Sequence, residues 1–203
     1  VMEGGHYLNT TDMNVNSNFT VAAWFKTRDS DVYYNTLFGD YDSLSGNGGW
    51  ALRFASDSSS LLFQVTTTCG LDYDSIFGNA NDSQWHFVAV VFNDTTSQSM
   101  YDGLFNSGKD YGAGCTIIDS NHSLLIGNSP TQQRPFEGYI DEVMLFNRSL
   151  SSEELLALYN NSQYRLYHNF TSLLAGTYNY SAYAMDDAGN LQVTATRNVT
   201  YNE

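Results

Sequence analysis

The sequence has few basic residues and no long apolar run. Its 203 residues include eight lysines and arginines against 22 aspartates and glutamates, for a formal net charge of −14. Binding to nucleic acid or to an anionic membrane surface needs a basic surface, so this composition argues against both. No apolar run approaches the roughly 18 residues of a membrane-spanning helix, and no secretory signal segment is present. We therefore expect a mature or excised piece with no membrane insertion.

Proline and cysteine are also scarce, with two residues of each, whereas the chain contains 15 tyrosines and 16 glycines. This composition favours a soluble β protein with many polar loops. Cys69 and Cys115 lie in the glycine-flanked segments "TTTCGLD" and "GAGCTII". An even number of cysteines in an exported chain favours one disulfide; the alternative is two buried free thiols.

N-glycosylation signals are more frequent than expected. Chance placement gives roughly four Asn-x-Ser/Thr motifs in a chain of this composition. The motif begins at ten residues: Asn9, Asn18, Asn81, Asn93, Asn121, Asn147, Asn160, Asn169, Asn179 and Asn198. We expect an exported, N-glycosylated surface protein; the alternative is that Asn- and Thr-rich turns form the motif by accident.

Short strands separated by turn clusters occupy residues 1 to about 148. In "NFTVAAWFKT", alternation places Phe19, Val21, Ala23 and Phe25 on one face. The other predicted strands are "TLFGD", "GWALRFA", "LLFQVTT", "QWHFVAVVFN", "SQSMY", "HSLLIGN" and "GYIDEVMLFN". Many strands at this spacing predict an all-β sandwich or jelly roll.

One helix is predicted in "SLSSEELLALYNN". Ser151 and Glu154 have the spacing of a capping box at its start. Leu155, Leu158 and Tyr159 form an apolar stripe. A helix of about nine residues is not stable alone in water, so we expect this stripe to pack on the sandwich.

Four segments, in order, resemble the markers of a laminin-G-like, concanavalin-A-like jelly roll. They are "NFTVAAWFKT", "QWHFVAVVFND", "MYDG" and "FEGYIDEVMLFNRSLSSEELLALYN", within about residues 3–160. Met100 and Phe146 depart modestly from the usual pattern. The resemblance implies a jelly-roll sandwich with one short C-terminal helix over residues 1–161, and a cell-surface binding or scaffold role.

Residues 162–203 form the second predicted domain and resemble the last three strands of an immunoglobulin-like module. The strands are predicted at 164–172, 177–185 and 191–201, with an apolar face opposite a face that carries the sequons. The predicted interface residues on the apolar face are Tyr178, Tyr180, Val193 and Val199. In predicted archaeal surface proteins such a tail often follows this jelly roll, so the resemblance implies an archaeal source.

Three strands leave one apolar face and two edges uncovered. The tail is expected either to fold back onto its own jelly roll or to be completed by a neighbouring chain. The short connector favours the second solution, a head-to-tail contact between copies that builds a filament or sheath. The predicted function is thus a non-enzymatic extracellular structural module. The alternative is a carbohydrate-binding or adhesion module of a cell-surface protein.

Catalytic residues are not evident. Glu137, Asp141 and Glu142 approach the carboxylate pattern of laminarinase-like relatives, but their order and spacing differ. The four histidines lie in unrelated segments, and no nucleophile or phosphate-loop motif is present. We therefore predict that the protein is not an enzyme.

Calcium is the predicted cofactor, in a structural role. Asp141 occupies the position where related jelly rolls often place a calcium ligand. Asp40 and Asp42 lie in an oxygen-rich loop, and Glu3 begins the N-terminal strand. Calcium takes six to eight oxygen ligands, including carboxylates. The alternative is that Asp141 only hydrogen-bonds the helix or an adjoining loop.

Aromatic residues are candidate sugar-binding residues, because jelly rolls of this type frequently bind glycans on aromatic surfaces. Trp50 follows two glycines and is predicted at a rim, with Tyr73 and Tyr111 also available. Trp24 and Trp85 lie in near-continuous apolar strands, so we expect them in the core.

Overall fold

The computed structural model divides into two units, Val1–Gln163 and Tyr164–Glu203, which are described separately. It describes residues 6–10, 17–28, 34–41, 48–76, 78–106, 108–131, 133–163, 174–181, 183–185 and 191–201. Glu3, Asp42 and Asn169 lie outside these ranges, as does the tail strand predicted at 164–172.

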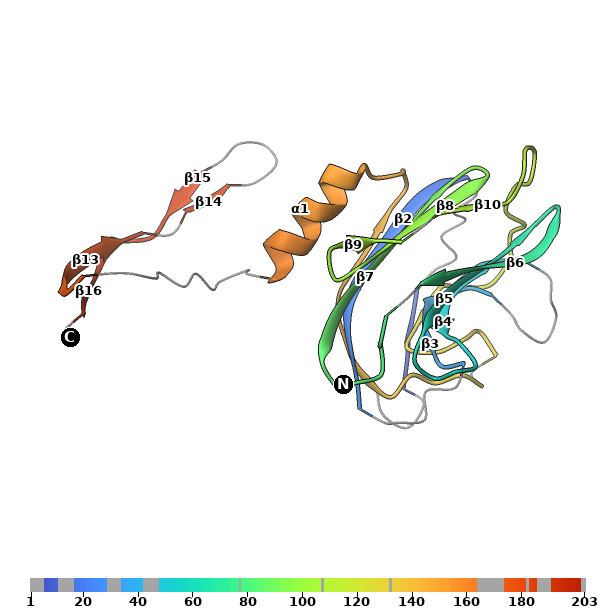
Figure 1. Cartoon of the computed structure of the whole chain (residues 1–203), viewed down its shortest axis with the longest axis horizontal. Coiled ribbons are helices and arrows are strands. Elements are labelled where there is room, and N and C mark those ends of the chain that lie inside the picture. The colour runs from blue at the N-terminus through green and yellow to red at the C-terminus, as the bar shows by residue number, and fades with distance from the viewer. Residues whose placement is uncertain are drawn as a thin grey trace. The chain divides into compact units, whose positions relative to one another are not determined.

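Two antiparallel sheets form the first unit (Figure 1). One has the order β1 (Leu8–Asn9), β11 (Leu125–Ile126), β3 (Thr36–Gly39), β4 (Trp50–Phe54), β5 (Leu61–Thr67) and β6 (Gly70–Ile76). The other has the order β10 (Lys109–Asp110), β8 (Thr96–Tyr101), β7 (Trp85–Asn93), β2 (Asn18–Thr27) and β12 (Gly138–Phe146), with β9 (Leu104–Phe105) beside β8. The predicted all-β sandwich is confirmed.

The core lies between the two sheets and follows the predicted alternation. Phe19 and Phe25 of β2 are fully buried. They pack against Trp50 and Phe54 of β4, with ring centroids 5.0 and 6.1 Å apart respectively. Because alternate residues of a strand face opposite sides, burying these side chains turns their neighbours onto the outer faces of the sheets.

The helix α1 (Ser152–Gln163) begins with the predicted capping box. The Glu154 backbone N–H donates to Ser151 Oγ at 3.3 Å, and the Ser151 N–H donates to Glu154 Oε2 at 2.9 Å. Leu155 is fully buried in a second apolar cluster with Phe87 and Ala89 on the outer face of the β7–β2–β12 sheet. The helix is twelve residues long, rather than about nine, and packs on the sandwich as expected.

A disulfide joins Cys69 and Cys115, as predicted, with their Cα atoms 5.4 Å apart. It ties the turn between β5 and β6 to the segment that precedes Ile117. Closing a loop of this length contributes about 3–4 kcal/mol in the chain-entropy model. Strand β6 was not predicted, because its sequence "GLDYDSI" is rich in residues that strands disfavour.

In the second unit, β13 (Gly176–Tyr180) pairs with β16 (Arg197–Tyr201), and β14 (Tyr183–Met185) pairs with β15 (Leu191–Val193). Each of the two long strands predicted here is therefore split in two. The register pairs Tyr178 with Val199 and Asn179 with Asn198, so the sequons lie opposite the apolar face, as predicted. The immunoglobulin-like assignment of the tail stays a prediction.

Candidate functional site

A cavity of about 230 Å³ opens on the outer face of the β3–β4–β5–β6 sheet. Its strand residues face away from the core, because they alternate with the buried residues of the same strands. Arg53 pairs with Thr36 of β3, and Gln64 pairs with Ala51 of β4 and Tyr73 of β6. The lining residues are Tyr34, Thr36, Tyr41, Ala51, Arg53, Gln64, Tyr73, Ser129 and Arg134.

Arg53 is fixed on the cavity floor. It is only 7% exposed, which is uncommon for a charged side chain. Its Nε donates to Gln64 Oε1 at 2.6 Å and its Nη1 to the Phe54 carbonyl at 3.0 Å. These two bonds hold the guanidinium in one orientation.

Tyr34 brings a second guanidinium close to the first. Its ring centroid lies 4.8 Å from Cζ of Arg53 and 4.7 Å from Cζ of Arg134. Two backbone bonds place Arg134: its N–H donates to Asn128 Oδ1, and its carbonyl accepts from the Thr36 N–H at 3.0 Å. Tyr34 has a φ of 59°, a strained backbone for a bulky residue of the kind that clusters at functional sites.

The cavity is electropositive within an acidic protein. Among the described residues, neither Arg53 nor Arg134 forms an ion pair with a carboxylate. Burial lowers the pKa of Arg53, and the charge of Arg134 lowers it further. The arrangement offers positive charge, hydrogen-bond donors and aromatic faces to a small polar ligand.

The predicted sugar-binding residues lie in different places. Tyr73 is 40% exposed and lines the cavity. Trp50 is 1% exposed and packs against Phe19, so the prediction that it lies at a rim is wrong. Tyr111 is also buried, and its hydroxyl lies 2.8 Å from Ser97 Oγ. Both residues point into the space between the sheets, where a surface ligand does not reach.

Sequence reasoning missed Arg53, Gln64, Tyr34 and Arg134. A signal for Arg53 is present in "GWALRFA", where it alternates with apolar residues that face the core. No comparable local pattern marks Tyr34 or Arg134, because turns and loops bring them to the sheet.

The expectation that Trp85 and Trp24 lie in the core is also wrong in part. Trp85 is 44% exposed. Trp24 is half-buried against α1, where its Nε1 donates to Ser162 Oγ at 2.8 Å. Both line a second cavity of about 360 Å³ with Asp141 and Glu142.

The calcium candidates do not converge among the described residues. Asp141 of β12 is exposed, and its Oδ1 accepts from the Glu142 N–H. Asp40 follows β3 in the other sheet, and its oxygens accept from the Trp50 N–H at 2.8 Å and from Ser120 Oγ at 3.1 Å. Burial raises the pKa of Asp40 to about 6. No three His, Cys, Asp or Glu side chains in the described part of the chain form a metal-binding group.

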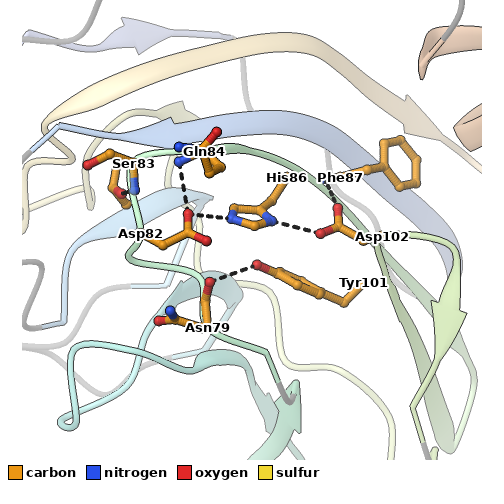
Figure 2. A network of polar contacts seen from close by, with 9 residues as sticks. Asn79, Asp82, Ser83, Gln84, His86, Phe87, Tyr101 and Asp102 are labelled. Atoms are coloured by element: carbon orange, nitrogen blue, oxygen red, sulfur yellow. Dashed lines mark hydrogen bonds and ion pairs between the residues drawn. The ribbon is translucent and has the colours of Figure 1, made fainter.

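A polar network surrounds His86 on β7 (Figure 2). Its Nδ1 lies 2.7 Å from Asp102 Oδ2, and its Nε2 lies 2.8 Å from Asp82 Oδ1. The imidazole is largely buried and stacks on Tyr101 with ring centroids 5.1 Å apart. Since both ring nitrogens already have carboxylate partners, this cluster joins two loops rather than offering a reactive group.

Nine of the ten sequon asparagines are described. Seven of them are exposed: Asn9, Asn93, Asn121, Asn147, Asn160, Asn179 and Asn198. Asn18 and Asn81 are half-buried. Whether any of them carries a glycan stays a prediction.

Residues 3–156 match the family described as the concanavalin A-like lectin/glucanases superfamily (Laminin_G_3), and the chain belongs to this family. The laminin-G-like resemblance of the jelly roll is thereby confirmed. Because the family description names both lectins and glucanases, the absence of enzymatic activity stays a prediction. A comparison with curated proteins gives no match.

Solved structures with a similar fold include domains LG4-5 of the mouse laminin alpha1 chain, at a TM-score of 0.55 and 16% identity over 72% of this chain and 40% of that one. The botulinum neurotoxin serotype D binding domain gives a TM-score of 0.59 and 16% identity, over 80% and 41% of the two chains. The binding domain of botulinum neurotoxin DC, solved in complex with SialylT, gives a TM-score of 0.56 and 14% identity, over 78% of this chain and 39% of that one. This chain thus spans about two fifths of each of these chains. At these identities the likeness shows the fold alone.

Proposed function

We propose that the protein is a carbohydrate-binding module of a cell-surface protein, and that the cavity beside Arg53 holds the sugar. The observation that carries the proposal is the combination of tyrosine faces and immobilised donors in one small cavity. Sugar rings present apolar C–H faces and a rim of hydroxyl groups, which suit aromatic faces and fixed polar side chains respectively. Tyr73 supplies an exposed ring, while Gln64 and Arg53 supply the fixed polar groups.

Binding domains with this fold support the proposal by analogy. One neurotoxin binding domain of similar fold was solved in complex with SialylT. That ligand belongs to the neurotoxin domain, and the sugar bound by this chain has to be identified separately.

A glycan microarray, followed by calorimetry on the best ligand, tests the proposal. Tyr73→Ala should weaken binding by roughly 3- to 10-fold, because it removes an aromatic face from the cavity wall. Tyr139→Ala is the matched control: it removes the same side chain from β12 of the other sheet and should leave affinity unchanged. An array with no bound glycan, or equal losses in the two variants, would refute the site.

Repeating the calorimetry and a melting curve in excess chelator tests the calcium prediction. A structural ion stabilises the folded state by mass action, so its removal should lower the melting temperature. Unchanged affinity and melting temperature would count against calcium.

An extracellular location is part of the same proposal. Laminin-G-like domains are typically extracellular, and the disulfide fits an oxidising compartment. The exposed sequons support export with N-glycosylation. In the part of the chain that the structure describes, no helix has the length and apolar character to cross a membrane.

Assembly through the tail is a second candidate function. The observation that favours it is an exposed apolar surface on the second unit. Tyr180, Val193, Val199 and Tyr201 are each about half exposed there. A two-stranded ribbon is marginally stable alone, so a covering partner would stabilise it. The proposed occupant is another copy of this chain.

Substitutions in β13 test this assembly in the full chain by light scattering and negative-stain imaging. Tyr180→Lys should reduce oligomers, because it places a charge on the apolar face. Thr177→Lys is the control on the opposite face of the same strand. A full-length protein that stays monomeric at high concentration, or equal effects of the two variants, would contradict assembly through this face.

A further inference from the structure

Two cations elsewhere in the described part of the chain, Lys109 and Arg148, are paired with acids, whereas the two arginines of the cavity are not. Lys109 lies 2.5 Å from Asp72, and Arg148 forms two bonds with Glu154 at 2.7 and 2.9 Å. The chain has 22 acidic residues for eight lysines and arginines, so potential partners are abundant. Arg53 and Arg134 nevertheless converge on one tyrosine ring without a carboxylate among the described residues.

Unused donors point to what completes this pair. A guanidinium has five N–H donors. Arg53 uses its Nε–H and one Nη1–H, which leaves three N–H groups without a described partner. No hydrogen bond from the Arg134 guanidinium is described, although its Cζ lies 4.7 Å from the Tyr34 ring centroid. A group with several acceptor oxygens and a negative charge would satisfy these donors.

Repulsion between the two guanidinium groups also favours a negatively charged group in this cavity. Two like charges held near each other in a partly buried site cost free energy unless an opposite charge lies close by. The lowered pKa of Arg53, due to burial and then to Arg134, is the expected sign of that cost. An anion beside both groups would convert the repulsion into two charge-assisted contacts.

We infer that the ligand of this cavity is an acidic sugar whose anionic oxygens lie against Arg53 and Arg134. The inference rests on the proposed carbohydrate-binding function and adds the charge of the ligand. At about 230 Å³ the cavity is smaller than the roughly 300–1,000 Å³ of typical drug-sized sites, so it suits one ring with its acidic substituent. The anionic group is a carboxylate or a sulfate ester, which present the same oxygens to a guanidinium.

The experiment uses the full chain on a microarray of matched pairs. Uronic-acid, sialylated and sulfated oligosaccharides are printed beside their carboxyl-reduced, desialylated and desulfated counterparts. We expect acidic members to bind at least about tenfold more tightly than the neutral ones at 0.15 M salt, since hydrogen bonds between charged groups are stronger than hydrogen bonds between neutral groups. The carboxylate and sulfate arms identify which anion is preferred.

Arg134→Gln should remove the preference for acidic sugars while leaving binding of the neutral ring. Arg134→Lys keeps the charge but not the planar fork of the guanidinium, and should retain the preference only in part. Arg28→Gln, at an exposed position on β2's C-terminal side, makes the same change in net charge and should leave the preference intact. Arg53→Gln is interpreted only if its circular dichroism shows a folded protein.

The outcomes separate the two claims. Equal binding of acidic oligosaccharides and their neutral counterparts overturns the inference and leaves the proposed carbohydrate binding in place. Equal losses in Arg134→Gln and Arg28→Gln mean that general electrostatics sets the preference, which also overturns it. Binding to no sugar at all overturns both the proposed function and the inference.

Discussion

Single residues show how strand parity decides which side chains face the core and which face the cavity. Trp50 and Arg53 lie three residues apart on β4, and therefore face opposite sides of the sheet. Trp50 stabilises the core, whereas Arg53 forms the cavity floor. An aromatic residue can therefore be assigned to a surface binding site only when the side of the sheet that it faces is known.

His86 is the residue whose charge should couple stability to pH. Burial alone would lower its pKa, but the bonds to Asp102 and Asp82 outweigh burial and raise it above the ordinary 6.5. The bond to His86 in turn lowers the pKa of Asp82 from 3.8. The contribution of His86 to the free energy of unfolding is therefore fully present below pH 6.5, and it is lost as the pH rises through the folded-state pKa of His86. That of Asp82 is present above pH 3.8 and lost in acid.

We predict that His86→Gln lowers the free energy of unfolding by about 2 kcal/mol near pH 5.5, because a charge-assisted hydrogen-bond pair is lost. The loss should be smaller at pH 9, because the charged form of the histidine is depleted as the pH rises through its raised pKa. Urea denaturation of both proteins at the two pH values measures it, with His6→Gln, at an exposed position, as the control. An identical loss at pH 5.5 and pH 9 would show that the charge of His86 does not contribute.

At the scale of elements, pairing between strands brings sequons together. Asn179 of β13 is the direct partner of Asn198 of β16, and Asn18 of β2 is the partner of Asn93 of β7. Directly opposed residues have Cα atoms roughly 4.5–5.5 Å apart and side chains on one face. Two bulky glycans at this spacing would collide.

We therefore predict about one glycan per cross-strand pair in the native protein, and independent occupancy at unpaired exposed sequons such as Asn121. In the β2–β7 pair, Asn93 should carry the glycan, because Asn93 is exposed whereas Asn18 is half-buried. Intact glycopeptide mapping of peptides that span both sites measures the occupancy. Full double occupancy of either pair would contradict the steric argument, and bare sequons throughout would contradict glycosylation itself.

For the whole molecule, the contrast between net charge and local charge matters most. A protein of net charge −14 repels acidic ligands at long range. A cavity that holds two arginines without a described acidic partner can still attract them at short range, since salt screens the distant charges over about 8–10 Å. Such a molecule would favour acidic sugars that fit the cavity over polyanions in general.

The sequence by itself determined the features that depend on local pattern. The alternation of apolar and polar residues predicted the strands of the sandwich and the two faces of the paired tail strands. Ser151 and Glu154 predicted where the helix begins, and the two cysteines predicted the disulfide. Each follows from side-chain period or side-chain chemistry within a short segment.

Only the tertiary structure decided which distant residues meet. Tyr34, Arg53, Gln64 and Arg134 converge because β4 lies between β3 and β5. The Arg134 segment is held beside β3 because the Thr36 N–H donates to the Arg134 carbonyl and the Arg134 N–H donates to Asn128 Oδ1. The same packing buried Trp50 and exposed Trp85. Strand order and loop placement arise from the mutual burial of whole sheets, and no window of the sequence contains that information.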